Sequence, residues 1–316
     1  MPNSYDYSEP KKLISEARLS SYKDSLALKT DAEILGAYSW NLTIVGAFFP
    51  LLQLIEVALR NSLNEIAKST IAVEEGKLWY QCIKYKQEEN DVGQLVNTEQ
   101  VKKFKQKFRS AKQGAMKSLE EKGNNPDTVT LDQIVSQTDF SVWEYILDKS
   151  FYNGSDNSFI WPTQLPKAFK KLPRVNTKNP MFHQRDAIRR RIEEVRAFRN
   201  RISHNEPAWR VCDVSKPEEV IAYLRMKLDN MLELIYWISP KFRTYVQDVG
   251  IEGRVRQVLS MSEFNRYIHT FETYNIEDIS GFVSLLEQTN SNNTRSYFEI
   301  EGRQGILSPY NTKLLQ

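Results

Sequence analysis

Residues 34–66 read ILGAYSWNLTIVGAFFPLLQLIEVALRNSLNEI and decide how the chain is interpreted. No charged residue occurs from Ile34 to Ile55, a length that could span a bilayer. Asn41, Gln53 and Pro50 interrupt this run, and polar groups are costly in hydrocarbon. Because the apolar residues recur at the spacing of one helix face, the stretch predicts a buried core helix, with a membrane span as the lesser alternative.

The same periodicity extends along the chain and predicts a helical protein. Asp31 is expected to cap the first helix, and Pro50 to start or kink a second one that continues to Ile66. Further helices are expected at 98–122, after Thr130, at 181–203 and at 218–238, whereas 73–97 is predicted to be a loop. Beyond residue 250 the pattern weakens. We therefore expect a helical domain over 1–250 and a less regular extension over 251–316, where YFEIEGRQGIL forms a hairpin or a tail.

Composition excludes several classes of protein. Lys and Arg number 43 against 40 Asp and Glu, and 41% of the 316 residues are apolar, which excludes a wholly disordered chain. Two isolated cysteines and three distant histidines cannot form a disulfide framework or a zinc cluster, so no metal or cofactor is expected. The N-terminal MPNSYDYSEPKK lacks the pattern of a signal peptide. We expect a soluble, cytoplasmic protein.

The expected helix at 98–122 is strongly basic, with eight Lys or Arg against three Glu. Phe104 and Phe108 give it a narrow inward stripe. Two interpretations of its outer face stay open, a merely solvated surface and a surface that faces nucleic acid.

The stretch RAFRNRISHNEP, residues 196–207, carries the chemistry. It places a guanidinium (Arg199), an amide (Asn200) and an imidazole (His204) close together in the sequence. Arginine offers a planar donor fork that suits a phosphate, and histidine titrates near neutrality and transfers protons. RNA self-cleavage needs such groups: a base that takes the 2′-OH proton, a cation that stabilises the phosphorane, and an acid that protonates the 5′-oxygen.

Helix geometry limits how these groups meet. Residues five apart in an ideal helix are rotated by about 140°, so Arg199 and His204 would not share a face. Pro207 restricts Glu206 to extended geometry, which predicts a helix end near residues 203–205. A terminating turn could swing His204 back toward Arg199, and we expect the site to lie at this helix end.

RNRISHNEP resembles the R-x(4–6)-H signature of HEPN-type ribonucleases, including the polar Asn200 after the arginine. More narrowly, the chain is similar over roughly residues 15–240 to the Abi-like (abortive-infection, AbiD and AbiF type) bacterial defence proteins. Three segments carry this resemblance in the family's order: FFPLLQLIEVALRNSL, TVTLDQIVSQTDFSVWEYIL and RAFRNRISHNEP. The chain departs from the family at DFSVW, where a TFGFW-like run is usual. It also departs at Phe198, which stands where an extended HEPN pattern has a basic residue; Glu194 fits the acidic position.

The resemblance implies an all-α, HEPN-like helical bundle with additional helices. It implies a metal-independent endoribonuclease that leaves a 2′,3′-cyclic phosphate and a 5′-OH, acts as a toxin-like effector in anti-phage defence, and builds its site at a homodimer interface. Arg199 and His204 would be catalytic, with Asn200 orienting them or contacting phosphate. We assign substrate binding to Arg60, Asn61, Arg196, Arg201 and Glu206. An RNA or protein antitoxin is a further expected partner.

Other interpretations of these residues stay open. His204 could be a structural histidine at a helix end, and Glu206 could only stabilise the turn. Glu56, Arg60 and Asn61 could form a buried polar bracket instead of contacting RNA. The rival function is a non-catalytic helical module that binds RNA or protein. If His204 is the only catalytic imidazole of each chain, the acid and base roles need either two copies of it or another group, and a dimer with two facing His204 residues is the simplest expectation.

Overall fold

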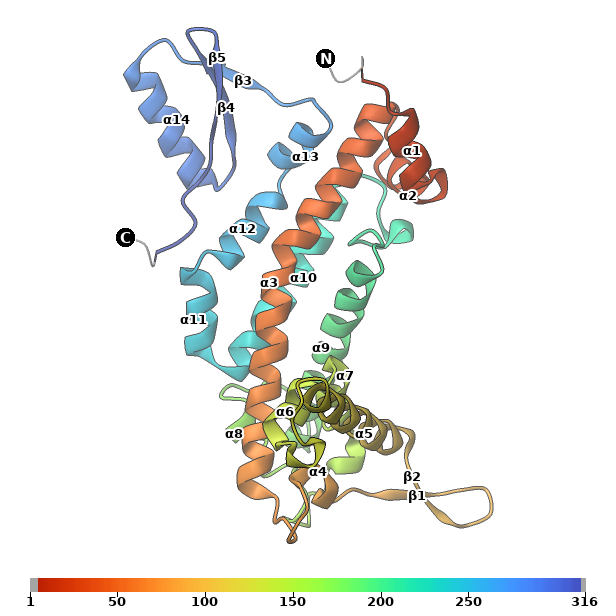
Figure 1. The fold of residues 1–316 in the computed structure, drawn as a ribbon. Helices are drawn as coiled ribbons and strands as arrows, with labels where there is room; N and C mark the ends of the chain where they lie inside the picture. Colours follow the sequence, from red (N-terminus) through yellow and green to blue (C-terminus); the bar gives the residue numbers. More distant parts are fainter. Residues whose placement is uncertain (1–4, 314–316) are drawn as a thin grey trace. The chain divides into compact units, whose positions relative to one another are not determined.

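The computed structural model describes residues 5–313 and is largely helical, with helices over 62% of the chain. The predicted all-α class is thereby confirmed, although small sheets accompany the helices (Figure 1). Contacts divide the chain into two compact units. Unit 1 takes residues up to 53, 198–230 and those from 243 on; unit 2 takes 54–197 and 231–242. Four helices contribute residues to both units, namely α3 (Asp31–Thr70), α9 (Pro180–Ser203), α10 (Pro217–Ile238) and α11 (Pro240–Asp248). The predicted division at residue 250 stays a prediction.

The elements of unit 1 come from both ends of the chain. They are α1 (Ser8–Ile14), α2 (Glu16–Leu26), the first part of α3, the end of α9, a 3-10 turn at Val211–Asp213, the start of α10, the end of α11, α12 (Ile251–Val258), α13 (Met261–Tyr267), β3 (Thr273–Asn275), α14 (Ile279–Asn292), β4 (Ser296–Ile300) and β5 (Arg303–Leu307).

Unit 2 holds the middle of the chain. Besides its parts of α3, α9, α10 and α11 it contains α4 (Trp79–Cys82), β1 (Gln87–Glu89), β2 (Leu95–Asn97), α5 (Glu99–Glu120), α6 (Leu131–Ser136), α7 (Phe140–Tyr145) and α8 (Leu165–Ala168), with short 3-10 turns at Pro126–Thr128 and Lys149–Phe151. The loop predicted at 73–97 is therefore wrong in part. Trp79 and Tyr80 are buried there, Trp79 packs 5.3 Å from Phe108 between ring centroids, and this long-range packing holds a short helix that no local pattern indicates.

Helix α3 is one continuous helix of 40 residues, and Pro50 lies inside it. The prediction that Pro50 starts a second helix is wrong. A proline removes one backbone hydrogen bond and its ring crowds the carbonyl four residues earlier. That earlier residue is Gly46, and a Cβ built there would meet nothing within 4 Å, so this turn has room around it.

The start of α3 also differs from the prediction. Thr30, not Asp31, caps the helix: its hydroxyl accepts from the amide of Glu33 at 3.2 Å, and the Glu33 carboxylate accepts from the amide of Thr30 at 2.9 Å. This reciprocal pair is a capping box. Asp31 instead forms an ion pair with Lys11 at 3.0 Å.

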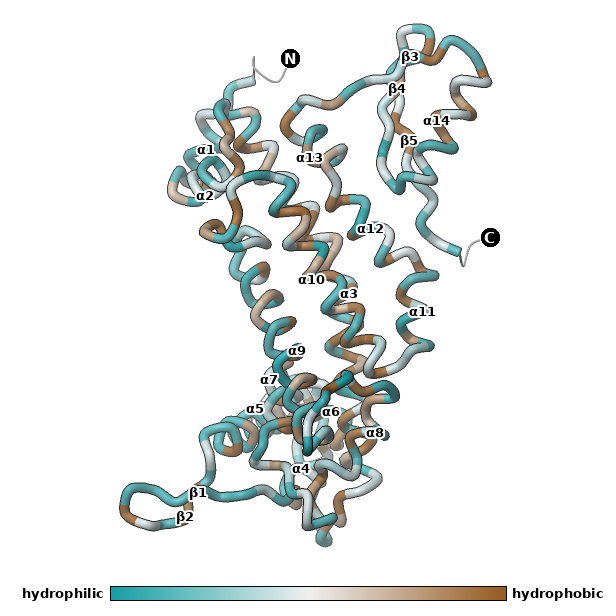
Figure 2. The backbone as a smooth tube through the Cα atoms, turned by 180° about the vertical axis from the view of Figure 1, so that it is seen from behind, coloured by the Kyte–Doolittle hydropathy of each residue, from teal (hydrophilic) through white to brown (hydrophobic). Residues whose placement is uncertain are grey.

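Apolar positions recur along α3 (Figure 2). Its inward face is buried at Trp40, Ile44, Phe48 and Leu51, whereas Leu42, which the spacing placed on that face, is 51% exposed. By length and composition α3 is the one helix within residues 5–313 that could cross a membrane, and 33% of its most apolar window is buried in this chain.

Aromatic side chains form the core of unit 1. Trp40 and Trp209 are both fully buried, with ring centroids 5.9 Å apart, and Tyr22 meets Trp209 edge-on at 5.6 Å. The indole N–H of Trp209 donates to Ser25 at 3.2 Å, and the backbone N–H of Ala208 donates to Asn41 at 2.9 Å. These contacts fix the segment that follows α9.

The extension after residue 250 contains helices and one small sheet. Strands β3 and β4 pair in parallel, with α14 between them in sequence, and β4 and β5 form an antiparallel hairpin. The hairpin predicted for YFEIEGRQGIL is confirmed. Its register sets Phe298 opposite Gly305.

Candidate functional site at the end of helix α9

Helix α9 ends at Ser203, within the predicted range. The chain then reverses in a two-bond turn: the amide of Glu206 donates to the carbonyl of Arg201 and the amide of Asn205 to that of Ile202, each at 3.2 Å. Asn205 has a φ of 57°, the left-handed conformation that such a Schellman turn requires. The residue before Asn205 is His204, so the imidazole is carried by the helix-capping position itself.

The backbone stays helical through His204, whose amide donates to the carbonyl of Asn200 at 3.0 Å. We expected that a terminating turn could bring His204 back toward Arg199. The backbone does not do this, because the chain reverses only at Asn205. Helix geometry then keeps Arg199 and His204 about 140° apart around the axis. Asn200 and His204 are four residues apart and share one face.

The predicted catalytic side chains are open to solvent. Arg199 and His204 are exposed and Asn200 is half-buried. Within residues 5–313 the side chains of these three residues have no hydrogen-bond or ion-pair partner in the chain. The backbone of the helix end is thus fixed by its own turn, while the functional groups stay available to a ligand.

Arg18 is a neighbour of this turn that sequence reasoning missed. It lies in α2, and its guanidinium donates to the backbone carbonyl of Asn205. A cation at a helix C-terminus interacts favourably with the carbonyls that have no helical partner there. No local pattern could indicate this contact, because 187 positions separate the two residues in sequence.

The apolar side of the helix end is anchored independently. The ring of Phe198 packs 5.0 Å from that of Phe48 on α3, measured between centroids. Ile202, four residues further along α9, is also buried. Phe198 stands where the extended HEPN pattern has a basic residue, and here it serves the core.

Arg201 and Glu206, both predicted to bind substrate, form an ion pair at 3.0 Å across the turn. Their side chains are 28% and 51% exposed, so the pair closes the turn on its solvent side. A phosphate that bound Arg201 would compete with the Glu206 carboxylate. Substrate binding by these two residues stays a prediction.

Arg196, Arg60 and Asn61 belong to unit 2, on α9 and α3. Arg196 donates to the carboxylate of Glu144 at 2.7 Å. Burial raises the pKa of Glu144, and the hydrogen bond from Arg196 offsets only part of that rise. Arg60 is half-buried and Asn61 exposed, and among the described residues no ion pair links Arg60 to Glu56.

The arginine run at 189–191 is engaged within unit 2. Arg190 pairs with Asp186 at 2.8 Å, Arg191 with Glu233 at 2.7 Å, and Arg189 with Glu193 at 3.2 Å. These pairs favour a structural role for the run over guidance of RNA. Glu194, expected to support the site, pairs with Arg191 at 3.4 Å.

Helix α5 separates its basic residues onto two sides. Lys103 pairs with Glu99 at 3.4 Å and Lys107 with Asp139 at 2.5 Å. A second row, which we call the α5 basic stripe, consists of Lys102, Lys105, Arg109 and Lys112. The spacing of three, four and three residues sets these four on one helix face. Lys105 lies 4.3 Å over the ring of Tyr85, and the other three are exposed, with no ion pair in the part of the chain that the structure describes.

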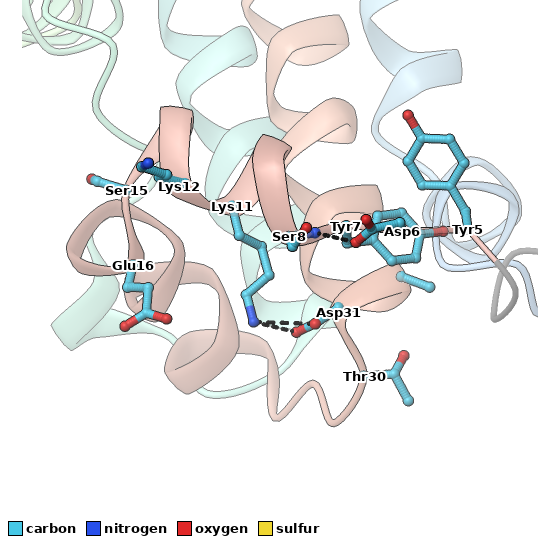
Figure 3. A pocket seen from close by; sticks show the side chains of 11 residues that line it. Tyr5, Asp6, Tyr7, Ser8, Lys11, Lys12, Ser15, Glu16, Thr30 and Asp31 are labelled. Atoms are coloured by element: carbon cyan, nitrogen blue, oxygen red, sulfur yellow. Dashed lines mark hydrogen bonds and ion pairs between the residues drawn. The ribbon is translucent and has the colours of Figure 1, made fainter.

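A cavity of about 820 Å³ lies beside α1 and the start of α3 (Figure 3). Lys11 and Asp31, which form an ion pair, both line it. Glu16, at the start of α2, also lines it, whereas Arg199 and His204 do not. No group of three His, Cys, Asp or Glu side chains within residues 5–313 is placed to hold a metal ion.

A comparison with known protein families finds a match over most of the chain. Residues 7–210 match the family described as Abi-like protein, a range that includes α3, α5 and the whole of α9 with its terminal turn. No curated protein and no solved structure matches the chain. The matched range covers well over half of the 316 residues. The chain therefore belongs to the Abi-like protein family.

Proposed function

We propose that this protein is a metal-independent endoribonuclease that acts as a toxin-like effector in abortive-infection defence against phage. The observation that carries the proposal is the end of α9, where Arg199, Asn200 and His204 are presented to solvent without partners in the described chain. Family membership supports the defence role.

Each group has a role in cutting RNA. His204 takes the proton from the 2′-OH, which attacks the adjacent phosphorus and displaces the 5′-oxygen. Arg199 binds the non-bridging oxygens and stabilises the charge of the phosphorane. Asn200, on the face of His204, orients the imidazole or the phosphate. The products are a 2′,3′-cyclic phosphate and a 5′-OH.

We further propose that the working site contains two copies of the chain. One imidazole per chain cannot act as base and acid in the same step, and helix geometry turns Arg199 and His204 to different sides of α9. The second copy supplies the second imidazole, which in its protonated form gives a proton to the departing 5′-oxygen. Light scattering should then give twice the 36.9 kDa mass of one chain, and specific activity should fall on dilution.

The deciding experiment is an RNA cleavage assay in excess EDTA with analysis of the product ends. The wild type should cut RNA and leave cyclic phosphate ends, whereas Arg199→Ala and His204→Ala should not. Arg174→Ala and His183→Ala serve as matched controls, since Arg174 is exposed and lies outside the helix end. Cleavage that EDTA abolishes, or that survives in both site variants, would contradict the mechanism.

A second candidate, a non-catalytic RNA-binding module, is favoured by the α5 basic stripe alone. The growth rate of cells that express the protein distinguishes the nuclease from the binding module. Expression of a nuclease should slow growth in a manner that depends on His204, while a binding module should not. Co-expression screens for an RNA or protein antitoxin are informative only if the protein is a nuclease.

Recovery of the protein from the soluble, cytoplasmic fraction without detergent tests the expected location and the membrane alternative for α3.

A further inference from the structure

A second cavity, of about 620 Å³, lies within unit 1. The exposed side of the first turns of α3, the end of α13 and the strands β3–β5 line it. Its volume falls in the range of about 300–1,000 Å³ typical of small-molecule pockets. Neither Arg199 nor His204 contributes to it.

Two glycines shape the walls of this cavity. A Cβ on Gly36 would lie 2.0 Å from the backbone oxygen of Tyr267, so only glycine lets the end of α13 approach α3 this closely. A Cβ on Gly305 would lie 2.3 Å from the ring of Phe298 on the neighbouring strand. The outer edge of this ring therefore lies against the backbone of β5 at Gly305. These contacts hold the cavity walls in fixed positions.

The lining is rich in aromatic rings. Tyr7, Tyr267, Phe271, Tyr297 and Phe298 all contribute to it. Phe271 and Tyr297 pack with centroids 4.6 Å apart, and the Tyr267 hydroxyl bonds to Thr43 at 2.5 Å. Rigid rings of this kind stack against flat ligands, and stacking on a nucleic-acid base contributes about 1–3 kcal/mol.

The charge of the lining is of one sign. Arg266 carries the permanent charge of the lining, and none of the lining residues is acidic. The Arg266 guanidinium lies 4.7 Å over the ring of Tyr267. Behind it the fully buried Glu263 faces two guanidiniums, Arg266 at 3.6 Å and Arg295 at 3.4 Å. One carboxylate against two cations leaves an excess positive charge beside the cavity.

Arg266 links the cavity to the buried carboxylate. Its Nη1 lies 3.6 Å from Glu263 without forming a hydrogen bond, and its side chain is 30% exposed and lines the cavity. The guanidinium therefore remains partly available to acceptor oxygens of a ligand.

From these features we propose that the cavity binds a nucleotide, with its base stacked on the aromatic lining and its phosphate held by Arg266. A flat ring joined to an anion meets both properties of the lining, the aromatic rings and the excess of positive charge beside them. The guanidinium fork matches phosphate oxygens. The inference does not depend on ribonuclease activity.

Calorimetry on the full chain tests the proposal with AMP, GMP, CMP and UMP, and with adenosine and inorganic phosphate as separate arms. At least one monophosphate should bind, and at least about tenfold more tightly than the phosphate-free nucleoside or phosphate alone, the effect of one strong charge-assisted contact. Arg266→Gln should remove that gain. Arg254→Gln, an exposed arginine of the neighbouring α12, should not.

Because Arg266 also neutralises Glu263, Arg266→Gln could lose nucleotide binding by unfolding the protein. A second variant that leaves this ion pair intact therefore tests the cavity separately. Ser39→Trp fills the cavity from the exposed side of α3 and should abolish binding while the melting temperature stays close to that of the wild type. Failure of all four monophosphates to bind at millimolar concentration would overturn the proposal. So would unchanged binding in both cavity variants, or binding that His204→Ala abolishes, since that nucleotide would occupy the end of α9.

Discussion

The guanidinium of Arg18 donates a hydrogen bond to the backbone carbonyl of Asn205, the residue that follows His204. Helix α2 thereby holds the turn that ends α9. The turn has its own two backbone bonds, so the contact adds a restraint from outside the helix to a local structure that is already formed.

Arg18→Ala should reduce both stability and RNA cleavage, because the turn loses a cation at its carbonyl end. We expect a loss of about 1 kcal/mol in the free energy of unfolding. Arg18→Lys, which keeps the charge, should retain more of both properties. Urea unfolding and single-turnover cleavage measure the effects. Lys23→Ala removes a cation from the last turn of α2 itself and is the control for cleavage, which it should leave unchanged.

Replacement of Asn205 probes the left-handed turn. Asn205→Gly should leave stability and cleavage close to wild type, because glycine adopts a φ of 57° without strain. Asn205→Val should lower the free energy of unfolding by about 1–2 kcal/mol, since a β-branched side chain is strained in this region. Thermal unfolding and cleavage assays provide the comparison. Equal stability of the two variants would show that the turn does not adopt the left-handed conformation.

The α5 basic stripe should contribute to RNA affinity. The double variant Lys102→Glu/Arg109→Glu, made on an inactive His204→Ala background, should bind single-stranded RNA more weakly and with a smaller salt dependence. Each phosphate that the double variant no longer neutralises should reduce the slope of log K against log salt by about 0.7. Lys117→Glu, which reverses a charge on the same helix at a lysine 3.8 Å from Glu121, is the comparison and should have a smaller effect. Unchanged slopes in the double variant would show that the stripe is only solvated.

Asp139 should make stability depend on acid. Partial burial acts to raise the pKa of this N-cap residue of α7, but hydrogen bonds from Lys107 and Ser141 outweigh it, and the pKa lies below its ordinary value of 3.8. A lowered folded pKa stabilises the fold at neutral pH, and this contribution is lost as pH falls through the folded pKa. Asp139→Ala should therefore cost about 1 kcal/mol at pH 7 and progressively less below pH 4. Asp139→Asn keeps a cap and should cost less. Denaturant titrations across this pH range give the result, and a cost that grows toward acid would contradict it.

Elements with local signals were predictable from the sequence. Thr130 and Gln133 form the capping box that begins α6, and α9 and α10 end within one residue of their predicted limits. The prediction at Asp31 was wrong because the neighbouring Thr30 caps the helix instead, and the prediction of a second helix from Pro50 was wrong because α3 is continuous through the proline.

The site shows the same limit. Sequence reasoning located the helix end and its side chains, since the spacing of Arg199, His204 and Pro207 is local. It could not reveal Arg18, nor the pairing of Arg196 with Glu144, because these contacts join segments distant in sequence. The catalytic assignment itself stays a prediction for the cleavage assay.

The cavity proposed to bind a nucleotide is built from two parts of the chain. Its α3 wall lies inside the matched range 7–210, whereas Arg266, Tyr297 and Gly305 lie outside it. Mutations in β4 or β5 can therefore alter what the cavity accepts without changing a residue of α9. The proposed ligand preference of the cavity and the proposed chemistry of the helix end can thus change independently in evolution.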